Sequence, residues 1–395
     1  MNKPSFLPYG RQTIEEDDVA SVTAALRGAF LTTGPLVEEY ENAFARAVGA
    51  EHAVCCNNGT AALHLAVLAT GIGPGDAVVV PSITFLATAN AARMVGADVV
   101  FADVDSDSGL MTAETLSQAL NRIGPGKVKL AIPVHLNGQF CDMSSLKEVA
   151  DRHGTSLIED ACHALGAPSA GSTSSSRAAC FSTHAVKAIA TGEGGCVTTS
   201  EAPLAGAMRV LRNHGMTRAS QAFRNTSMSH DEGIPNPWYY EMAELGWNYR
   251  LPDILCALGI SQLKKLERFW KRRDEIAQQY DRLLAPLAPT VRPVARNSGA
   301  HGFHLYAVLV DFAALGLSRA RFMKTLLARG IGTQVHYIPV HLQPYYRELN
   351  GEMFLPGAEA YYSRCLSLPI FPSMSDEDVK RVAEAIAEIV GVRLT

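Results

Sequence analysis

One lysine of the chain stands where a positive charge is hard to solvate. Lys187 lies in "FSTHAVKAIATGEGGCVTT", residues 181–199, among small and apolar residues and ahead of a glycine cluster. A desolvated lysine loses its proton more readily and becomes a nucleophile toward carbonyl groups. This stretch alone leaves open an ordinary lysine on an exposed turn, so the choice depends on the rest of the chain.

Two further strand ends carry polar residues that suit chemistry. In "NNGTAAL", Gly59 and Thr60 link an apolar strand to a helix start, where free N–H groups make a phosphate site. In "LIEDACHALGA", Asp160 ends an apolar strand, and His163 follows three residues later. A carboxylate there is poorly solvated and needs a cation or a hydrogen-bond donor as a partner. The alternatives are an ordinary helix cap and a carboxylate that caps the next turn.

Taken together, these residues match the needs of one cofactor, pyridoxal phosphate. That cofactor requires a lysine for its aldehyde, an acid facing its pyridine nitrogen and a cradle for its phosphate. Its flat ring also favours an aromatic neighbour. Phe85, in "PSITFLATAN" at another strand end, is placed for that role, unless it belongs to the plain core.

Alternating strand-like and helical patterns predict how these residues are positioned. Strands are predicted at 52–56, 76–81, 98–105, 128–136 and 155–161, and amphipathic helices at 60–71, 84–96, 112–123 and 143–154. Continuous β-branched runs between helices indicate a parallel sheet buried on both faces. Right-handed crossovers then bring the carboxyl ends of the strands to one edge, where ligands bind in open α/β sheets.

The second half of the chain indicates a smaller α+β unit. Residues 216–240 form a long polar excursion, and 252–287 is a long helical region that leads out of the first domain. Beyond it come a strand-like run at 304–310, a helix at 318–330, the segment "IGTQVHYIP" and a closing helix at 375–390. We therefore predict a large domain over 1–265, including an N-terminal arm, and a small domain over 266–395.

Charge and composition exclude several classes of protein. The 395 residues include 35 Lys+Arg and 39 Asp+Glu, a net charge of −4, which disfavours nucleic-acid binding through a basic face. The stretch "KKLERFWKRRD" is interpreted as a solvated helix face. No apolar run reaches the length of a membrane span, and the N-terminus lacks the apolar core of a secretory signal. Eight cysteines, mostly in apolar segments, indicate reduced thiols in a cytoplasmic protein.

The histidines are also candidate metal ligands. His301 with His304, and His336 with His341, stand close enough in sequence to pair. No carboxylate or cysteine completes either set nearby, so no metal is expected. A nicotinamide-dependent dehydrogenase is disfavoured as well, because no GxGxxG follows the first strand.

Several blocks of the sequence together resemble one known family. They are "YGRQTIEEDD", "LTTGPLVEEYE", "NNGTAALHLA", "PSITFLATANA", "PVHLNGQFCDM", "IEDACHALGA", "GEGGCVTT" and "LGWNYRLPDILCALGISQL". Over nearly the whole chain they are similar to the DegT/DnrJ/EryC1/StrS sugar aminotransferases. The resemblance implies the aspartate-aminotransferase fold of type I, with a mostly parallel central sheet. The most similar branch is that of the UDP-4-amino-4,6-dideoxy-N-acetyl-β-L-altrosamine transaminases of pseudaminic acid biosynthesis.

The resemblance implies a role for each matching residue. Lys187 bonds covalently to the cofactor and moves protons, Asp160 pairs with the pyridine nitrogen, and His163 lies beside the ring. Phe85 stacks on the other face, and Gly59, Thr60 and Ser182 hold the phosphate. Asn248 is implied to reach the cofactor phosphate or substrate of the neighbouring subunit. The implied nucleotide-sugar contacts are Tyr9, Phe30, Leu31, Thr32, Arg250, His336, Tyr337, Ile338 and Pro339.

The same resemblance implies an activity and its partners. A homodimer with shared active sites would move nitrogen from glutamate to C4 of a UDP-linked 4-keto-6-deoxy-N-acetylhexosamine, in making cell-surface polysaccharide. A C3-transaminase, a GDP-sugar 4-transaminase and a non-catalytic regulatory homologue remain alternatives. The related sugar dehydrases carry histidine in place of the lysine, so Lys187 disfavours them.

Two departures from the family pattern bear on the site. Relatives usually read Phe-Ser-Phe-His-Pro before the lysine turn, whereas this chain has Thr183, His184 and Ala185 after Phe-Ser. Relatives often carry Ser-Asp where this chain has Arg177 and Ala178. Both departures are expected to lie close to the cofactor loop.

Overall fold

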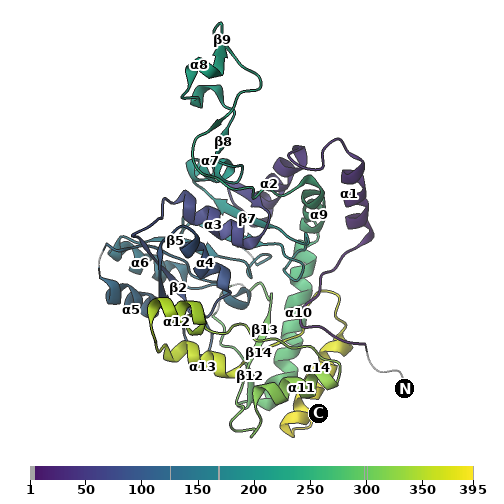
Figure 1. Cartoon of the computed structure of the whole chain (residues 1–395). Coiled ribbons are helices and arrows are strands. Elements are labelled where there is room, and N and C mark those ends of the chain that lie inside the picture. Colours follow the sequence, from purple (N-terminus) through teal and green to yellow (C-terminus); the bar gives the residue numbers. More distant parts are fainter. Residues whose placement is uncertain (1–4, 125, 168–169, 298, 300, 395) are drawn as a thin grey trace.

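Strands and helices alternate along the first half of the chain and build a seven-stranded sheet (Figure 1). The computed structural model describes residues 5–394 except 125, 168–169, 298 and 300. The sheet order is β1-β7-β6-β5-β4-β2-β3, and only β7 runs antiparallel to its neighbours. The strands are β1 (His52–Cys56), β2 (Ala77–Pro81), β3 (Asp98–Ala102), β4 (Val128–Ala131), β5 (Ser156–Asp160), β6 (Ala178–Ser182) and β7 (Gly195–Thr199). The predicted, mostly parallel sheet is confirmed, with β6 and β7 as strands that the pattern did not predict.

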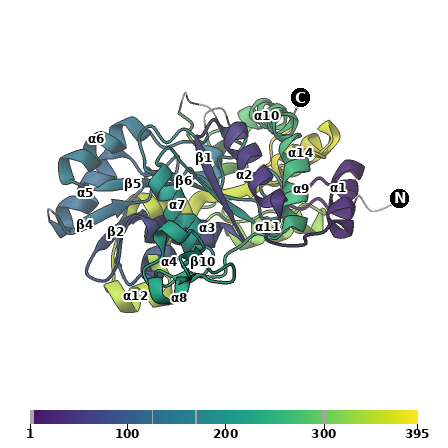
Figure 2. The ribbon, with the colours of Figure 1, turned by 90° about the horizontal axis from the view of Figure 1, so that it is seen from above.

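Helices connect the strands of the sheet, and several of them begin at a side chain that caps their first turn. The connecting helices are α3 (Gly59–Ala69), α4 (Leu86–Met94), α5 (Ala113–Ile123), α6 (Met143–His153) and α7 (Ala202–Leu211). The Asn58 side chain accepts the Ala61 N–H and so starts α3, and Thr112 and Asp142 start α5 and α6 in the same way. Helix α5 packs against β2 and β3 and α6 against β5, and in the view from above both lie on the opposite side of the molecule from α1, α2 and α9 (Figure 2).

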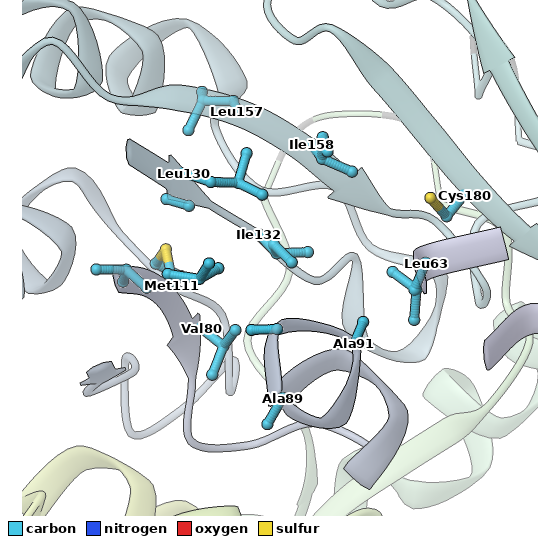
Figure 3. Packing of buried hydrophobic residues seen from close by; sticks show 14 of the residues in the cluster. Leu63, Val80, Ala89, Ala91, Met111, Leu130, Ile132, Leu157, Ile158 and Cys180 are labelled. Carbon is cyan, nitrogen blue, oxygen red and sulfur yellow. The ribbon is translucent and has the colours of Figure 1, made fainter. Parts of the chain in front are cut away.

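The main core lies between the sheet and its helices. Figure 3 shows Val80, Leu130 and Ile158 of the sheet on the face that Leu63 of α3 and Ala91 of α4 cover. These side chains are fully buried, and burying each larger aliphatic one contributes about 1.5–3 kcal/mol. The sheet is therefore a rigid platform for residues at its strand ends.

The N-terminal segment packs beside this platform. Helices α1 (Glu16–Arg27) and α2 (Pro35–Val48) both contact α9 (Asp253–Leu263). Buried Asp18 accepts hydrogen bonds from Lys265 Nζ at 2.7 Å and from Gln262 at 2.8 Å. This pairing satisfies a carboxylate that would otherwise be costly to bury.

The C-terminal part forms its own antiparallel sheet, in the order β12-β13-β14. Its elements are α10 (Leu266–Leu284), β12 (Val291–Pro293), β13 (Tyr306–Val310), α11 (Arg319–Ala328), α12 (Pro344–Asn350), α13 (Pro356–Arg364), β14 (Cys365–Leu368) and α14 (Asp376–Val390). A second core fills the space between this sheet, α10, α11 and α14. Residues 331–339 form no strand of their own and make only isolated bridges at Ile331 and Gln334. The domain boundary after 265 falls between α9 and α10 and stays a prediction.

The excursion predicted after residue 216 projects away from the rest of the chain (Figure 1). It contains β8 (Met216–Thr217), α8 (Thr226–Ser229), β9 (His230–Asp231), β10 (Ile234–Pro235) and β11 (Glu241–Met242). Two short ladders, β8 with β11 and β9 with β10, hold it together. Within the described residues, no helix is both long and apolar enough to cross a membrane.

Candidate active site

A cavity of about 920 Å³ opens at the carboxyl ends of the parallel strands. Its walls come from the segments that follow β1, β2, β5 and β6, and from residues 334–338 of the C-terminal part. The expected convergence of strand ends at one edge is therefore confirmed. The cavity brings together these predicted residues: Lys187, Asp160, His163, Gly59, Thr60, Ser182, Phe85, Tyr9, His336, Tyr337 and Ile338.

Lys187 lies in the connection between β6 and the antiparallel strand β7. The last residue of β6, Ser182, pairs with the first of β7, Gly195, so the connection leaves and returns at the cavity edge. Hydrogen bonds from Lys187 N to His184 O (2.8 Å) and from Ala185 N to Gly192 O (3.1 Å) shape the turn. Burial lowers the pKa of Lys187 from its ordinary value, against the opposing effect of nearby Cys162 and Asp160. A lowered pKa makes an amine a better nucleophile, which is the property that the role predicted for Lys187 needs.

Asp160 ends β5 and is held in place by two donors. Its Oδ2 accepts the Thr88 hydroxyl at 2.7 Å, and its Oδ1 accepts the Cys162 N–H at 3.1 Å. The Thr84 and Thr88 hydroxyl oxygens are also 2.7 Å apart. A buried carboxylate with fixed orientation can pair with a cationic ring nitrogen in the cavity.

The start of α3 forms a concave surface beside Ser182. The side chain of Asn58 accepts the N–H of Ala61. The N–H groups of Gly59 and Thr60 lie in the first turn, where the helix itself offers no acceptor, so they are available to a ligand. A Cβ atom on Gly59 would stand 2.9 Å from Ser182 Cβ and 3.4 Å from Cys162 Sγ. Because only glycine fits there, the backbone can approach a phosphate closely. The lysine, the carboxylate and this surface lie in one cavity and fit pyridoxal phosphate.

Aromatic and imidazole rings line the rest of the cavity. Phe85 is 56 % exposed, which excludes the plain-core alternative, and its ring lies 5.9 Å from that of Tyr337. His163 is buried, with Nε2 at 3.0 Å from the Tyr337 hydroxyl. Burial, with the nearby Lys187, lowers the pKa of His163 well below its ordinary value. Burial also lowers the pKa of His336 to about 3, so both rings are neutral at physiological pH.

The remaining predicted residues do not line this cavity. Asn248 pairs through its backbone with Asn213, whose side chain accepts a 2.6 Å hydrogen bond from Arg250. Phe30 and Leu31 are 54 % and 49 % exposed. The other predicted contacts outside the cavity are Thr32 and buried Pro339.

Sequence reasoning missed several residues of the site. Thr88 lies in the first turn of α4, four residues after Thr84, and its hydroxyl contacts both Thr84 and Asp160. Cys162 stands two residues after Asp160 and also lines the cavity. Tyr249 and His304 line it too, from distant parts of the chain, and no local pattern indicates either one.

One expectation about the departures is wrong. Arg177 and Ala178 lie at the start of β6, whereas the cavity lies at its other end, at Ser182. Four strand residues separate the two ends by roughly 13 Å. Arg177 instead binds Glu201 through two hydrogen bonds of 2.9 and 2.6 Å, away from the lysine turn. The Thr183 hydroxyl does lie at the loop, 2.6 Å from that of Thr191.

The histidine pairs serve other contacts. His301 Nδ1 accepts the Phe303 N–H at 3.0 Å, and His341 Nδ1 lies 2.5 Å from the Ser82 hydroxyl. Across the described residues, no three or more His, Cys, Asp or Glu side chains are grouped to hold a metal ion.

Comparisons with known proteins agree with this geometry. Residues 12–387 match the DegT/DnrJ/EryC1/StrS aminotransferase family. The chain is 41 % identical over 392 residues to the spore coat polysaccharide biosynthesis protein SpsC of Bacillus subtilis, covering 98 % of this chain and 97 % of that protein. Among solved structures, it is similar to Helicobacter pylori PseC, an aminotransferase involved in the biosynthesis of pseudoaminic acid. That match has TM-score 0.86 and 27 % identity, and it covers 98 % of this chain and 100 % of the other. It is also similar to the putative sugar aminotransferase Spr1654 of Streptococcus pneumoniae in its PMP form, with TM-score 0.87, 29 % identity and coverage of 98 % and 99 %.

Proposed function

The chain belongs to the DegT/DnrJ/EryC1/StrS aminotransferase family, and from that premise we propose its reaction. It transfers the amino group of glutamate to C4 of a UDP-linked 4-keto-6-deoxy-N-acetylhexosamine. Family membership confirms the expected aminotransferase fold and pyridoxal phosphate as the cofactor. The observation that carries the proposal is the placement of Lys187, Asp160 and the start of α3 in a single cavity.

The chain's own residues would hold the cofactor at its phosphate, its aldehyde and its pyridine nitrogen. The N–H groups of Gly59 and Thr60, with the Ser182 hydroxyl, would bind its phosphate, and Lys187 would bond to its aldehyde. The Asp160 carboxylate would keep a proton on the pyridine nitrogen, because opposite charges favour that protonated state. When bound, pyridoxal phosphate supplies an electron-accepting ring that allows an amino group to be taken up and passed on.

With the cofactor and substrate bound, Lys187 would act as the acid and base of the site. Its Nζ would take a proton from the amino-acid substrate and hold it for return, and the same atom would move the proton for the sugar. A general base works best when its pKa lies near the working pH. The lowered pKa of Lys187, caused by its burial, is in the direction this role needs.

The size and lining of the cavity support a nucleotide-sugar substrate. Its volume of about 920 Å³ is at the upper end of small-molecule sites, roughly 300–1,000 Å³. Tyr9, His336, Tyr337 and Ile338 also line the cavity, and we propose that they contact the sugar. The names of SpsC and PseC, for a spore coat polysaccharide and for pseudoaminic acid, support a role in making surface sugars. We place this synthesis in the cytoplasm, consistent with eight free cysteines.

Residues outside the cavity support a homodimer with shared sites. Phe30 and Leu31 are exposed apolar residues, and Leu245, at the base of the excursion, is 72 % exposed. We propose that these surfaces meet in the dimer, and that Asn248 and Arg250 of one subunit complete the cavity of the other. Thr32 and Pro339 would then contact the nucleotide at the edge of the shared cavity.

A chemical test addresses the cofactor lysine directly. Borohydride reduction makes the bond between lysine and cofactor permanent, so peptide mapping should find the cofactor on the peptide that contains Lys187. K187A should fold, bind no cofactor covalently and lose turnover. The control K147A removes an exposed lysine that pairs only with Asp151, and it should behave as the unmodified protein. A label on another lysine, or full activity of K187A, contradicts the assignment.

A substrate panel tests the sugar. UDP- and GDP-linked keto-sugars, each with the keto group at C3 or C4, are incubated with glutamate, and the amino-sugar products are identified by mass spectrometry and NMR. We expect turnover with the UDP-linked 4-keto-6-deoxy-N-acetylhexosamine. Preference for a GDP-sugar or for C3 supports the corresponding alternative, and no turnover with any of them supports a non-catalytic homologue.

Mixing two inactive variants tests the shared site. If Asn248 serves the partner's cavity, heterodimers of K187A and N248A contain one intact site and one doubly altered site. Random mixing should then restore about a quarter of the normal activity, since half the dimers are mixed and half of their sites are intact. No recovery after subunit exchange, shown by mass spectrometry, contradicts sharing.

A further inference from the structure

The protonation of His163 follows from the two groups that its nitrogens contact. Nδ1 lies 3.3 Å from the backbone nitrogen of Asn137, and Nε2 lies 3.0 Å from the Tyr337 hydroxyl. A backbone N–H can only donate, so Nδ1 must present a lone pair. A neutral imidazole then carries its single proton on Nε2, and a doubly protonated ring would direct two N–H groups at one another. His163 is therefore the neutral Nε2–H form.

The backbone around Asn137 fixes this contact. Asn137 has φ 63°, a left-handed conformation that asparagine tolerates better than most residues, and its side chain donates to Tyr361. Gly138 follows with φ 94°, and a Cβ there would stand 2.8 Å from the carbonyl oxygen of His163. This tight packing keeps the Asn137 N–H aimed at the imidazole, so its donor direction cannot be reversed by a side-chain rotation.

The direction of the first hydrogen bond determines that of the next. Because Nε2–H donates, the Tyr337 oxygen accepts, and the proton of Tyr337 is left for another acceptor. We propose that Tyr337 donates a hydrogen bond to an oxygen atom of the ligand bound in the cavity, and that His163 is the positioning residue that fixes this direction. The proposal rests on the function proposed above, since it assumes that a cofactor and a sugar occupy the cavity.

The groups around His163 and Tyr337 keep the imidazole neutral and the phenol protonated. Lys187 and His336 face His163, and His304 lies against it with ring centroids 4.5 Å apart. Burial and Lys187 also lower the pKa of His304, so the neighbouring ring is neutral as well. Burial, with Asp160 nearby, raises the pKa of Tyr337 well above its ordinary value, so it keeps its proton. Tyr337 is thus a donor and not a base.

The ligand atom is a carbonyl or phenolate oxygen, the acceptor that a phenol donor suits. Two ligands can supply it, namely the cofactor, through the phenolic oxygen attached to its ring, and the sugar, through its keto oxygen. Both have the same chemistry, and they are separated by adding one ligand at a time.

The first experiment observes the protonation state without any turnover. Protein labelled with ¹⁵N at its 12 histidines is studied by long-range ¹H–¹⁵N correlation, with and without pyridoxal phosphate, and the His163 signals are those absent from H163Q. We expect the neutral Nε2–H pattern in both samples. A doubly protonated ring or a proton on Nδ1 overturns the proposal. Because the sample without cofactor also reports, this result is independent of whether the proposed reaction is correct.

The second experiment tests the donated proton with Y337F, whose fold is checked by circular dichroism. Loss of one hydrogen bond should weaken its target about tenfold. A tenfold weaker binding of pyridoxal phosphate, with a shifted absorption band, identifies the cofactor oxygen. A tenfold lower kcat/KM for the sugar half-reaction, with the glutamate half-reaction unchanged, identifies the sugar oxygen. If neither changes by threefold, the proposal is wrong.

Paired variants of His163 test the positioning role. H163Q retains an N–H near the Nε2 position and can donate to Tyr337, whereas H163M is of similar length and cannot donate. Y337F should lower either the affinity for pyridoxal phosphate or the kcat/KM of the sugar half-reaction. We expect that same property to stay within threefold of the normal protein in H163Q and to fall about tenfold in H163M. Equal behaviour of H163Q and H163M overturns the role of His163. If borohydride mapping fails on Lys187 while the NMR result holds, the proposed function fails and the hydrogen-bond direction stands.

Discussion

Replacing Asp160 with asparagine should separate its charge from its shape. The carboxylate accepts the Cys162 N–H at Oδ1 and the Thr88 hydroxyl at Oδ2. In D160N the amide oxygen must take the Cys162 N–H, which can only donate, and the NH₂ group then faces Thr88. The Thr88 hydroxyl can accept from that group and turn its proton to Thr84, 2.7 Å away. The variant therefore keeps its hydrogen bonds and should fold.

The expected magnitudes differ between stability and catalysis. Exchanging two charge-assisted hydrogen bonds for neutral ones should cost about 1 kcal/mol each, a shift of a few degrees in Tm for a chain of this size. The lost attraction to a cationic ring nitrogen is larger. At about 4 Å and an effective dielectric constant near 20 it amounts to about 4 kcal/mol, or roughly a thousandfold in rate.

Thermal stability and catalytic rate are measured separately on the same variant. Thermal unfolding gives the Tm, and stopped-flow absorbance of the bound cofactor gives the rate of the glutamate half-reaction. The control D142N removes an exposed carboxylate that caps α6, and its rate should be unchanged. A D160N rate within tenfold of normal, in protein that is folded and loaded with cofactor, would refute the electrostatic role of Asp160.

Two further predictions follow from the geometry of single residues. G59A should lose most of its affinity for pyridoxal phosphate in an absorbance titration, because the new Cβ lies 2.9 Å from Ser182 Cβ; G73A, with nothing within 4 Å, should not, and equal affinities would contradict the phosphate surface. Burial lowers the pKa of His301 to about 3, below the value near 6.5 of an unfolded histidine. Its contribution to stability is therefore complete above pH 6.5 and is lost as pH falls toward 3, by up to about 1.4 kcal/mol per pH unit. In H301N the amide oxygen can accept the Phe303 N–H without titrating, so urea unfolding between pH 6.5 and 4 should show a shallower loss; an unchanged slope would contradict the assignment.

The parallel strands were predictable because their burial on both faces leaves a continuous apolar pattern. Residues 77–81 are all buried and are apolar throughout. The two strands around the lysine were missed because their residues, "AACFS" and "GCVTT", are mostly small or polar. The antiparallel direction of β7 was not predictable either. The direction of a strand depends on the strands with which it pairs, and the spacing of residues within the strand does not indicate those partners.

Strand-end residues of the site were predictable for the same reason. Asp160 ends an apolar strand, and parallel topology brings such ends together. Lys187 was indicated by the small and apolar residues around it, and not by the strands on either side. His304 and Tyr249 depend on how distant segments pack, so one sequence does not indicate them. The basic stretch 264–274 also shows the limit of local reading: Lys265 and Arg273 are buried, the first against Asp17 and Asp18 and the second against backbone carbonyls.

The antiparallel pairing of β7 with β6 constrains the length of the connection between them, residues 183–194. Both strands that hold the lysine connection are buried along their whole length, and they are paired from Ser182 and Gly195 onward. Sliding β7 by one residue would turn every side chain to the opposite face, so a deletion between 183 and 194 cannot be absorbed by the sheet. The projecting excursion is joined at β8 and β11 only and bears no such constraint. Insertions and deletions among relatives should therefore accumulate in the excursion and be absent from the lysine connection.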